Sequence, residues 1–439
     1  MRISHPFFLF PLGLVCALSV SPRAQAGLMH PDYDLQTYRD FAENRGKFAA
    51  DATEVEINFK DGKRAGILPR MMSFESVVDE GFAALTGNAQ FLASVAHNGG
   101  YTTASFTKRF GGDDSYRVIK KNNGWGTETN YQYDIQVARL DKMVTEADFI
   151  PYMEDEAQLA KLENKLVIRV GGGTQDVAIT NEKAKNIAGA YQFLTGGTVK
   201  FAKVIVNPPA PNDKNAASKY KAYQFQYNLT VDKNPSNPLP IGVLAGDSGS
   251  ASWTYNEKNK RWEYIGPGQS GGGNGFSQMR GANAWCVDVI KSYFDPVVTP
   301  QAGKPVMWTP ANEKGEGKLT QDKRSWNYHG LAAGKQAASA SNDELEETRN
   351  LIFDGKAAIL QLTAPIDMGA GTLTFQGSYT LTPGDNPANT LNSAGMDIKE
   401  KSEVISQLTS AAGDEWRKIG KGTLFIQGKG DNPVRLNIG

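Results

Sequence analysis

Cysteine is nearly absent from this chain of 439 residues, which contains only Cys16 and Cys286. Two cysteines exclude a framework of several disulfides, and they exclude a zinc site made of cysteines. Cys286 lies between Trp285 and Val287. We expect its thiol to be a small buried apolar group rather than a reactive nucleophile.

Net charge is absent as well, because 47 lysines and arginines balance 47 aspartates and glutamates. The balance gives no electrostatic reason to expect nucleic acid or an anionic membrane as a partner. An apolar run long enough to span a bilayer is also missing. The nearest candidate, residues 6–20, follows Arg2 and precedes the small-residue sequence Ala24-Gln25-Ala26. This pattern is typical of a cleaved signal peptide of residues 1–26, with a membrane anchor as the alternative.

Short runs of alternating apolar and polar residues recur from about residue 35 to residue 294. Alternation with a period of two indicates half-buried strands, and the 46 glycines of the chain supply turns. The clearest strand-like runs are 54–59, 166–170 and 223–229. Few segments favour a helix, the candidates being 37–44 and 154–162. The pattern predicts an all-β fold.

The pattern changes near Pro300. Residues 299–350 are polar and predict a loop-rich connecting region. Beyond Gly355, strand-like runs recur between glycine turns, at 358–362, 372–375, 378–381, 423–426 and 434–438. This repeat favours the rungs of a β-solenoid, with a β-sandwich as the alternative. Because the chain stops at Gly439 inside such a run, we expect a solenoid that is cut short.

The loop Gly246-Asp247-Ser248-Gly249-Ser250 is of the kind that presents a nucleophilic serine, although the same residue types also build ordinary turns. A serine hydroxyl needs a base within hydrogen-bonding reach and a third group that orients the base. His97 ends an apolar run and precedes two glycines, which places it at a strand end. We predict that His97 is the base, with a purely structural histidine as the alternative. The other histidines lie in the signal, near the mature start and after the first β region: His5, His30 and His329.

Asp134 is the candidate for the orienting acid. It lies between aromatic and aliphatic neighbours, where a carboxylate is costly to bury without a partner, and a histidine ring N–H is such a partner. An ordinary aspartate on a surface strand is the alternative. The order His97, Asp134, Ser248 is the chymotrypsin-type order of the catalytic triad. An exported β-rich chain with this set favours a serine protease built from two β-barrels.

Several segments extend this pattern and carry a resemblance to a known family. The chain resembles the serine-protease autotransporter passengers of the immunoglobulin A protease family. The matching segments are 38–48, the histidine segment 93–101, the aspartate segment 134–146, the serine loop 246–250, and the β-helix rungs 366–371 and 418–424.

The resemblance implies a chymotrypsin-like double β-barrel protease domain (27–298), a connecting region (299–350) and the start of a right-handed parallel β-helix (351–439). It implies export through the periplasm to the cell surface, and an outer-membrane translocator barrel that this chain does not contain. We expect a monomeric secreted serine endopeptidase that cleaves host extracellular proteins as a virulence or colonisation factor. The alternative hypothesis is a proteolytically inactive adhesin or toxin-like passenger.

The resemblance also assigns roles to individual residues. Ser248 is the nucleophile, His97 the base and Asp134 the orienting acid, while the N–H groups of Gly246 and Ser248 form an oxyanion hole. No Ile-Val-Gly-Gly start exists whose new N-terminus would pair with Asp247, so this carboxylate needs another partner.

The same resemblance places a specificity pocket near three residues. Its base is expected at Gly242, six residues before the nucleophile, with walls at Tyr264 and Gly266. A glycine at the base offers no carboxylate to a basic substrate side chain, so we expect an uncharged, apolar residue before the scissile bond.

No cofactor and no metal are expected. The glycine run after Val170 lacks the spacing of a dinucleotide loop and predicts a hairpin turn.

Overall fold

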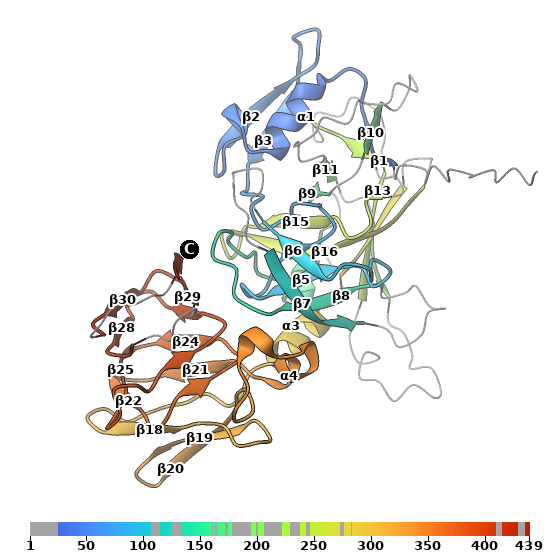
Figure 1. Cartoon of the computed structure of the whole chain (residues 1–439). Helices are drawn as coiled ribbons and strands as arrows, with labels where there is room; N and C mark the ends of the chain where they lie inside the picture. The colour runs from blue at the N-terminus through green and yellow to red at the C-terminus, as the bar shows by residue number, and fades with distance from the viewer. Residues whose placement is uncertain are drawn as a thin grey trace, which may run out of the picture.

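The computed structural model describes residues 25–106, 115–124, 134–159, 161–162, 165–171, 174–177, 195–198, 201–205, 222–228, 238–242, 246–272, 276–281, 283–409, 415–428 and 435–439. Figure 1 shows two connected parts: an N-terminal part, coloured blue to yellow, and a stack of parallel strands, coloured orange to red. Residues 1–24 of the predicted signal peptide lie outside the described residues, so its cleavage stays a prediction.

A five-stranded antiparallel sheet with the order β4-β5-β8-β7-β6 forms one half of the N-terminal part. Its strands are β4 (Ala84–Leu85), β5 (Phe91–Ser94), β6 (Thr103–Ser105), β7 (Ser115–Asn123) and β8 (Gln136–Leu140). Every residue of β5 and β8 is buried. Both faces of these two strands are therefore covered, which explains why β5 is a continuous apolar run rather than an alternating one.

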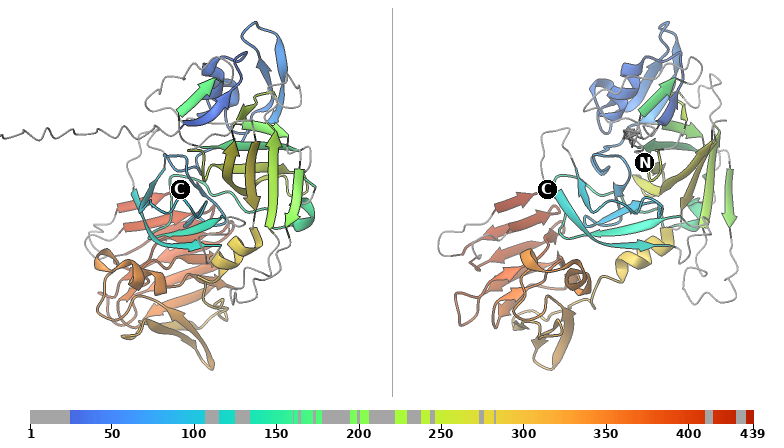
Figure 2. Two further views of the ribbon diagram at one scale, coloured as in Figure 1. Left: turned by 90° about the vertical axis from the view of Figure 1, so that its right-hand side faces the viewer. Right: turned by 45° about the vertical axis from the view of Figure 1, so that its right-hand side comes forward.

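A seven-stranded sheet with the order β11-β9-β15-β16-β17-β13-β12 forms the other half. Its strands are β9 (Leu166–Val170), β11 (Thr195–Thr198), β12 (Phe201–Ile205), β13 (Ala222–Asn228), β15 (Ala251–Asn256), β16 (Arg261–Gly272) and β17 (Phe276–Gly281). All of its pairings are antiparallel. Figure 2 shows this sheet, in green to olive, beside the first. The strand-like runs 166–170 and 223–229 are thus confirmed as β9 and β13.

Smaller elements complete the N-terminal part. The strand β1 (Gln25–Met29) pairs with β10 (Thr174–Val177) and with β14 (Ile241–Gly242), and β2 (Thr53–Asn58) pairs with β3 (Arg64–Arg70). The helical elements are α1 (Leu35–Ala42), η1 (Gly46–Phe48), α2 (Glu156–Leu159) and α3 (Asn283–Lys291). The hairpin predicted after Val170 is wrong, because β9 and β10 on either side of the glycine run pair into different sheets.

The C-terminal part is a solenoid of parallel strands. One sheet has the order β20-β19-β18-β22-β25-β28-β30, a second the order β21-β24-β27-β29-β31, and β23 pairs with β26. The bounds are β18 (Pro305–Thr309), β19 (Glu316–Gln321), β20 (Arg324–His329), β21 (Leu351–Asp354), β22 (Ala358–Leu362), β23 (Ile366–Asp367), β24 (Leu373–Gln376), β25 (Ser378–Thr382), β26 (Leu391–Asn392), β27 (Met396–Ile398), β28 (Glu403–Ser406), β29 (Glu415–Ile419), β30 (Thr423–Ile426) and β31 (Arg435–Ile438).

Equivalent residues of successive rungs stack inside the solenoid. Phe353 lies opposite Phe375 in register, and Phe375 lies opposite Ile398. The two phenylalanine rings stack with their centroids 5.1 Å apart and an interplanar angle of 9°. The predicted all-β fold is confirmed, and so is the β-helix in the C-terminal part; the sandwich alternative is wrong, because the rungs pair in parallel.

Residues 299–350 hold strands β18–β20, the turn η5 (Ala337–Ser339) and helix α4 (Asn342–Glu347), rather than loops alone. In strands β18, β19 and β20, buried residues are separated by exposed or half-buried ones, so none of the three strands is a continuous buried run. Their inward side chains Trp308, Leu319 and Tyr328 belong to the solenoid core. Ser341 and Glu344 form a capping box that begins α4.

Cys286 is fully buried in α3, as expected. Burial raises the pKa of the Cys286 thiol to about 12, so the thiol stays protonated and unreactive at neutral pH. Within the described ranges, none of the helices combines the length and the apolar composition needed to cross a bilayer.

Candidate active site

Strand pairing brings His97 and Asp134 together. In the antiparallel pair of β5 and β8, Ser94 lies opposite Gln136. His97 follows the end of β5 and Asp134 precedes the start of β8. Because the two strands are antiparallel, both residues lie at the same end of the strand pair. Asp134 is 6% exposed, and its carboxylate would be costly to bury there without donors.

Among the described residues, two groups of His97 bind the Asp134 carboxylate. The backbone N–H of His97 donates to Asp134 Oδ1 at 2.9 Å, and its ring Nδ1 contacts Asp134 Oδ2. On the other side of the ring, Nε2 lies 2.7 Å from Ser248 Oγ. The three predicted residues therefore form one continuous chain of hydrogen bonds, although they come from three separate segments. The other two described histidines lie elsewhere: His30 Nδ1 accepts the Asp32 N–H, and His329 pairs with Asp295.

The loop that carries Ser248 is a tight turn between the two sheets. Gly246 and Gly249 have φ values of 105° and 83°, which favour glycine. A Cβ on Gly249 would lie only 2.1 Å from the carbonyl oxygen of Phe82, so the loop packs directly against the first sheet. Among the described residues, no acceptor takes the N–H of Gly246 or of Ser248. The oxyanion hole expected from these two N–H groups stays a prediction.

Two further residues hold the loop, and neither was predicted from the sequence. The side chain of Asn98 donates from Nδ2 to the carbonyl oxygen of Ser248 at 2.6 Å. Arg169 lies 1% exposed in β9, with Nη2 3.2 Å from Asp247 Oδ2. A sequence signal for Arg169 existed, because an arginine inside the apolar run Leu166–Val170 needs a buried acceptor.

The three residues predicted to form the specificity pocket lie in two different strands. Gly242 lies in β14, where it pairs with Leu28 of β1. Gly266 lies in β16 with a φ of 149° and pairs with Ser252. The expectation that Tyr264 forms part of a pocket wall stays a prediction, and the backbone would carry that role because the side chain lies in the core. Tyr264 is 0% exposed, because its ring packs edge-on against Tyr152 within the core.

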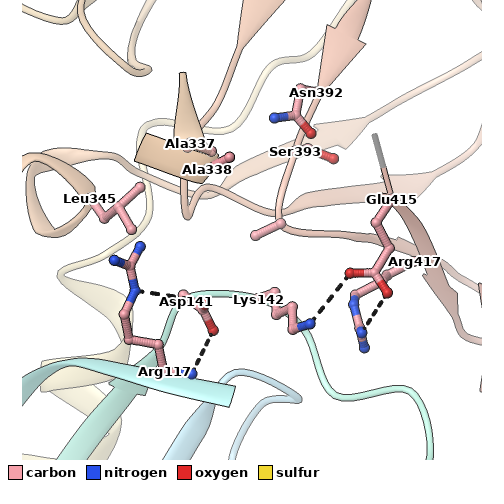
Figure 3. Close-up of a pocket in the computed structure, with 12 residues that line it drawn as sticks. Arg117, Asp141, Lys142, Ala337, Ala338, Leu345, Asn392, Ser393, Glu415 and Arg417 are labelled. Atoms are coloured by element: carbon pink, nitrogen blue, oxygen red, sulfur yellow. Dashed lines mark hydrogen bonds and ion pairs between the residues drawn. The ribbon is translucent and has the colours of Figure 1, made fainter. Parts of the chain in front are cut away.

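A cavity of about 210 Å³ lies at the junction of the N-terminal part and the solenoid, and none of its lining residues belongs to the predicted site. Figure 3 shows its charged lining. Glu415 accepts from Lys142 at 3.3 Å and from Arg417 at 2.7 Å, and Asp141 accepts the Arg117 backbone N–H at 3.0 Å. Because these charges pair with one another, we interpret the cavity as part of the junction rather than as a binding site.

Comparison with known proteins places the N-terminal part in a family. The model of the family described as immunoglobulin A1 protease matches residues 26–287. The adhesion and penetration protein autotransporter of Haemophilus influenzae is 29% identical, over 96% of this chain and 31% of the relative. The IgA-specific serine endopeptidase autotransporter of Neisseria gonorrhoeae is 27% identical, over 98% of this chain and 29% of the relative.

A solved structure supports the same assignment. The crystal structure of the Haemophilus influenzae Hap adhesin matches with a TM-score of 0.71 and 26% identity, over 92% of this chain and 45% of that chain. The chain thus spans less than a third of the length of these two relatives, and less than half of the solved structure.

Proposed function

The chain belongs to the immunoglobulin A1 protease family, and on this basis we propose that it is a serine endopeptidase exported as part of an autotransporter. The observation that carries the proposal is the hydrogen-bonded series from Asp134 through His97 to Ser248, in which His97 Nε2 lies 2.7 Å from Ser248 Oγ. A base at this distance is within reach of the proton that it must remove.

In the proposed reaction, Ser248 Oγ attacks the carbonyl carbon of the scissile bond while its proton passes to His97 Nε2. Asp134 accepts a hydrogen bond from the ring Nδ1–H, which fixes the tautomer and stabilises the imidazolium. The carbon–nitrogen bond then breaks, and His97 returns the proton to the leaving amine. Water attacks the acyl-enzyme by the same route in reverse, with His97 again as the base.

The negative charge that develops on the carbonyl oxygen needs donors at a fixed position. The N–H groups of Gly246 and Ser248 are the candidates, since no acceptor among the described residues takes them. Preorganised backbone donors of this kind contribute about 10²–10³-fold to turnover in comparable sites. Asn98 supports the same loop by binding the Ser248 carbonyl oxygen.

Export and substrate class follow from the relatives and are proposals for this chain. The relatives are described as autotransporters, so we propose export to the cell surface and, in the full-length protein, a translocator as partner. We propose that the substrates are host extracellular proteins and that the activity serves colonisation or virulence.

A preference for an uncharged residue before the scissile bond is expected from Gly242. A glycine at the base of the pocket offers no carboxylate, so burying an arginine side chain there would leave its charge unpaired. Peptide p-nitroanilides that end in leucine, alanine or arginine should differ in kcat/KM, with the best apolar substrate at least about tenfold better than arginine. Faster cleavage of the arginine substrate would overturn this preference but not the proposed triad.

Active-site labelling tests the proposed chemistry directly. A biotinylated fluorophosphonate should label the purified protein, and the label should vanish in Ser248→Ala and in His97→Ala. Losing either residue of a comparable triad costs about 10⁶-fold in turnover, so the contrast should be nearly all-or-none. Ser292→Ala is a matched control, because the Ser292 hydroxyl only donates to the carbonyl oxygen of Val289 near the end of α3. This variant should label like the wild type.

The alternative function is binding without proteolysis, and it has one observation in its favour. One relative is described as an adhesion and penetration protein, and the solved structure is described as an adhesin. A folded wild-type protein that takes no label would favour a proteolytically inactive adhesin or toxin-like passenger. Label retained in Ser248→Ala would place the nucleophile at another residue.

A further inference from the structure

Asp247 is a buried carboxylate directly before the nucleophile. Its side chain is 0% exposed, and the residue lies in the turn between Gly246 and Ser248. A carboxylate in this environment stays ionised only if a cation and hydrogen-bond donors replace its hydration. The chain offers no cleaved Ile-Val-Gly-Gly N-terminus for this purpose.

Arg169 provides the cation from inside the second sheet. Its strand β9 pairs with β15, and Arg169 lies opposite Ser252, which follows the serine loop closely in sequence. The guanidinium Nη2 is 3.2 Å from Asp247 Oδ2, and Nη1 donates to Ser250 Oγ at 3.0 Å. One arginine therefore binds residues on both sides of Ser248 and Gly249.

The loop has little freedom to adjust around this contact. The Ser250 N–H donates to the Asp247 carbonyl oxygen at 2.9 Å, and the Gly249 N–H donates to the Gly268 carbonyl oxygen at 2.8 Å. A Cβ added to Gly171 would lie 2.6 Å from Ser250 Cβ. Because the packing is this close, the position of the Asp247 carboxylate is coupled to the orientation of the neighbouring backbone N–H groups.

We propose that Arg169 is a positioning residue for the reaction: its ion pair with Asp247 holds the Gly246 and Ser248 N–H groups in the arrangement that binds the oxyanion. This inference rests on the proposed protease function. With Arg169 as the cation, the partner of Asp247 is a side chain of the folded domain. The serine loop 246–250 therefore takes its arrangement on folding and needs no newly cut N-terminus. The competing explanation is an ion pair that contributes to stability alone.

Kinetics on Arg169→Met, Arg169→Lys and the double variant Arg169→Met/Asp247→Asn separate these explanations. Arg169→Met should lower kcat about 10²–10³-fold, the usual cost of losing an oxyanion donor, with KM changed less than threefold. Arg169→Lys should recover part of the loss, because it keeps the charge but binds Asp247 and Ser250 less well. The double variant removes the unpaired buried charge, so its melting temperature should recover while its kcat stays low.

Arg417→Met is the matched control. Arg417 is also a buried arginine in an ion pair, with Nη2 2.7 Å from Glu415, but it lies in the solenoid junction. This variant should lose stability and keep the kcat of the wild type when assayed below its melting temperature.

A second check is an uncleaved extension before Gly27, which should leave kcat within about twofold of the wild type.

The outcomes distinguish the inference from the function on which it rests. Wild-type labelling together with an unchanged kcat in Arg169→Met would overturn the inference and leave the protease assignment standing. Recovery of both stability and kcat in the double variant would show that the ion pair acts through stability alone. Loss of activity on extending the N-terminus would show that a free α-amino group is needed. A folded wild-type protein without label would overturn the function itself.

Discussion

Asp134→Asn is expected to lower kcat about 10⁴-fold without changing the fold. Asparagine keeps the shape of the side chain, and its amide oxygen still accepts the backbone N–H of His97, now bonded at 2.9 Å. The amide nitrogen cannot accept a hydrogen bond from His97 Nδ1–H and instead donates one to Nδ1, so the ring takes the other tautomer. Nε2 then carries a hydrogen toward Ser248 Oγ and has no lone pair for the serine proton.

Steady-state kinetics with a peptide substrate and a thermal melt check this expectation together. The melting temperature should change little, and the rate of fluorophosphonate labelling should fall in parallel with kcat. Asp141→Asn is the matched control, because Asp141 is a carboxylate of the same segment that accepts the Arg117 backbone N–H instead. A kcat for Asp134→Asn close to that of the wild type would remove Asp134 from the proposed triad.

Much of the fold could be predicted from the sequence, because many strands are short apolar runs bounded by glycine turns. The run 358–362 coincides with β22 and the run 423–426 with β30, since each is a short run rich in apolar residues that follows a glycine turn. The strands β18–β20 were missed because half of their residues face water. Their assignment depends on the pairing of β18 with β22, which is a contact distant in sequence. Local composition carries no information about such a contact.

In the candidate site, too, some residues could be predicted from local sequence and others depend on contacts distant in sequence. His97, Asp134 and Ser248 have residue types and an order that point to one chemistry, and pairing of β5 with β8 brings the first two together. Arg169 belongs to no motif, and its two signals were indirect: an arginine inside an apolar run needs a buried acceptor, and Asp247 needs a cation. The direction of the Tyr264 ring could not be predicted, because strand position alone does not reveal which face of a strand is covered; the ring lies opposite Trp253 in the core.

Arg139 joins the N-terminal part to the solenoid in a way that makes the two parts depend on each other. It is fully buried in β8, and burial lowers its pKa to about 9, so it remains charged at neutral pH. Its Nη1 donates to the carbonyl oxygen of Thr348 at 2.9 Å, just beyond α4, and its Nη2 donates to that of Ala370 at 2.9 Å. The guanidinium also lies over the Tyr293 ring, 4.5 Å from its centroid.

Arg139→Met is therefore expected to cost several kcal/mol of the free energy of unfolding. It removes two hydrogen bonds from a charged donor, each worth about 1.5–3 kcal/mol, against a typical total of about 5–15 kcal/mol. Arg349 and Gln90 still donate to the carbonyl oxygens of Thr348 and Ala370, so neither acceptor loses its last donor. Urea unfolding followed by tryptophan fluorescence should show a lower midpoint, and the solenoid and N-terminal part should no longer unfold together.

A half-exposed arginine at the same junction provides the comparison. Arg117 donates to the carbonyl oxygen of Ala340 at 3.2 Å, its Nε lies 3.9 Å from Asp141 Oδ2, and its side chain is 38% exposed. Arg117→Met should cost less than about 1 kcal/mol, because water replaces the lost donor. The loss of unfolding free energy in Arg139→Lys should lie between the losses in Arg117→Met and Arg139→Met. One ammonium group cannot make the hydrogen bonds of both Nη1 and Nη2 of the guanidinium. Equal midpoints for Arg117→Met and Arg139→Met would mean that the junction is held by packing, and that the fold of the N-terminal part does not depend on Arg139.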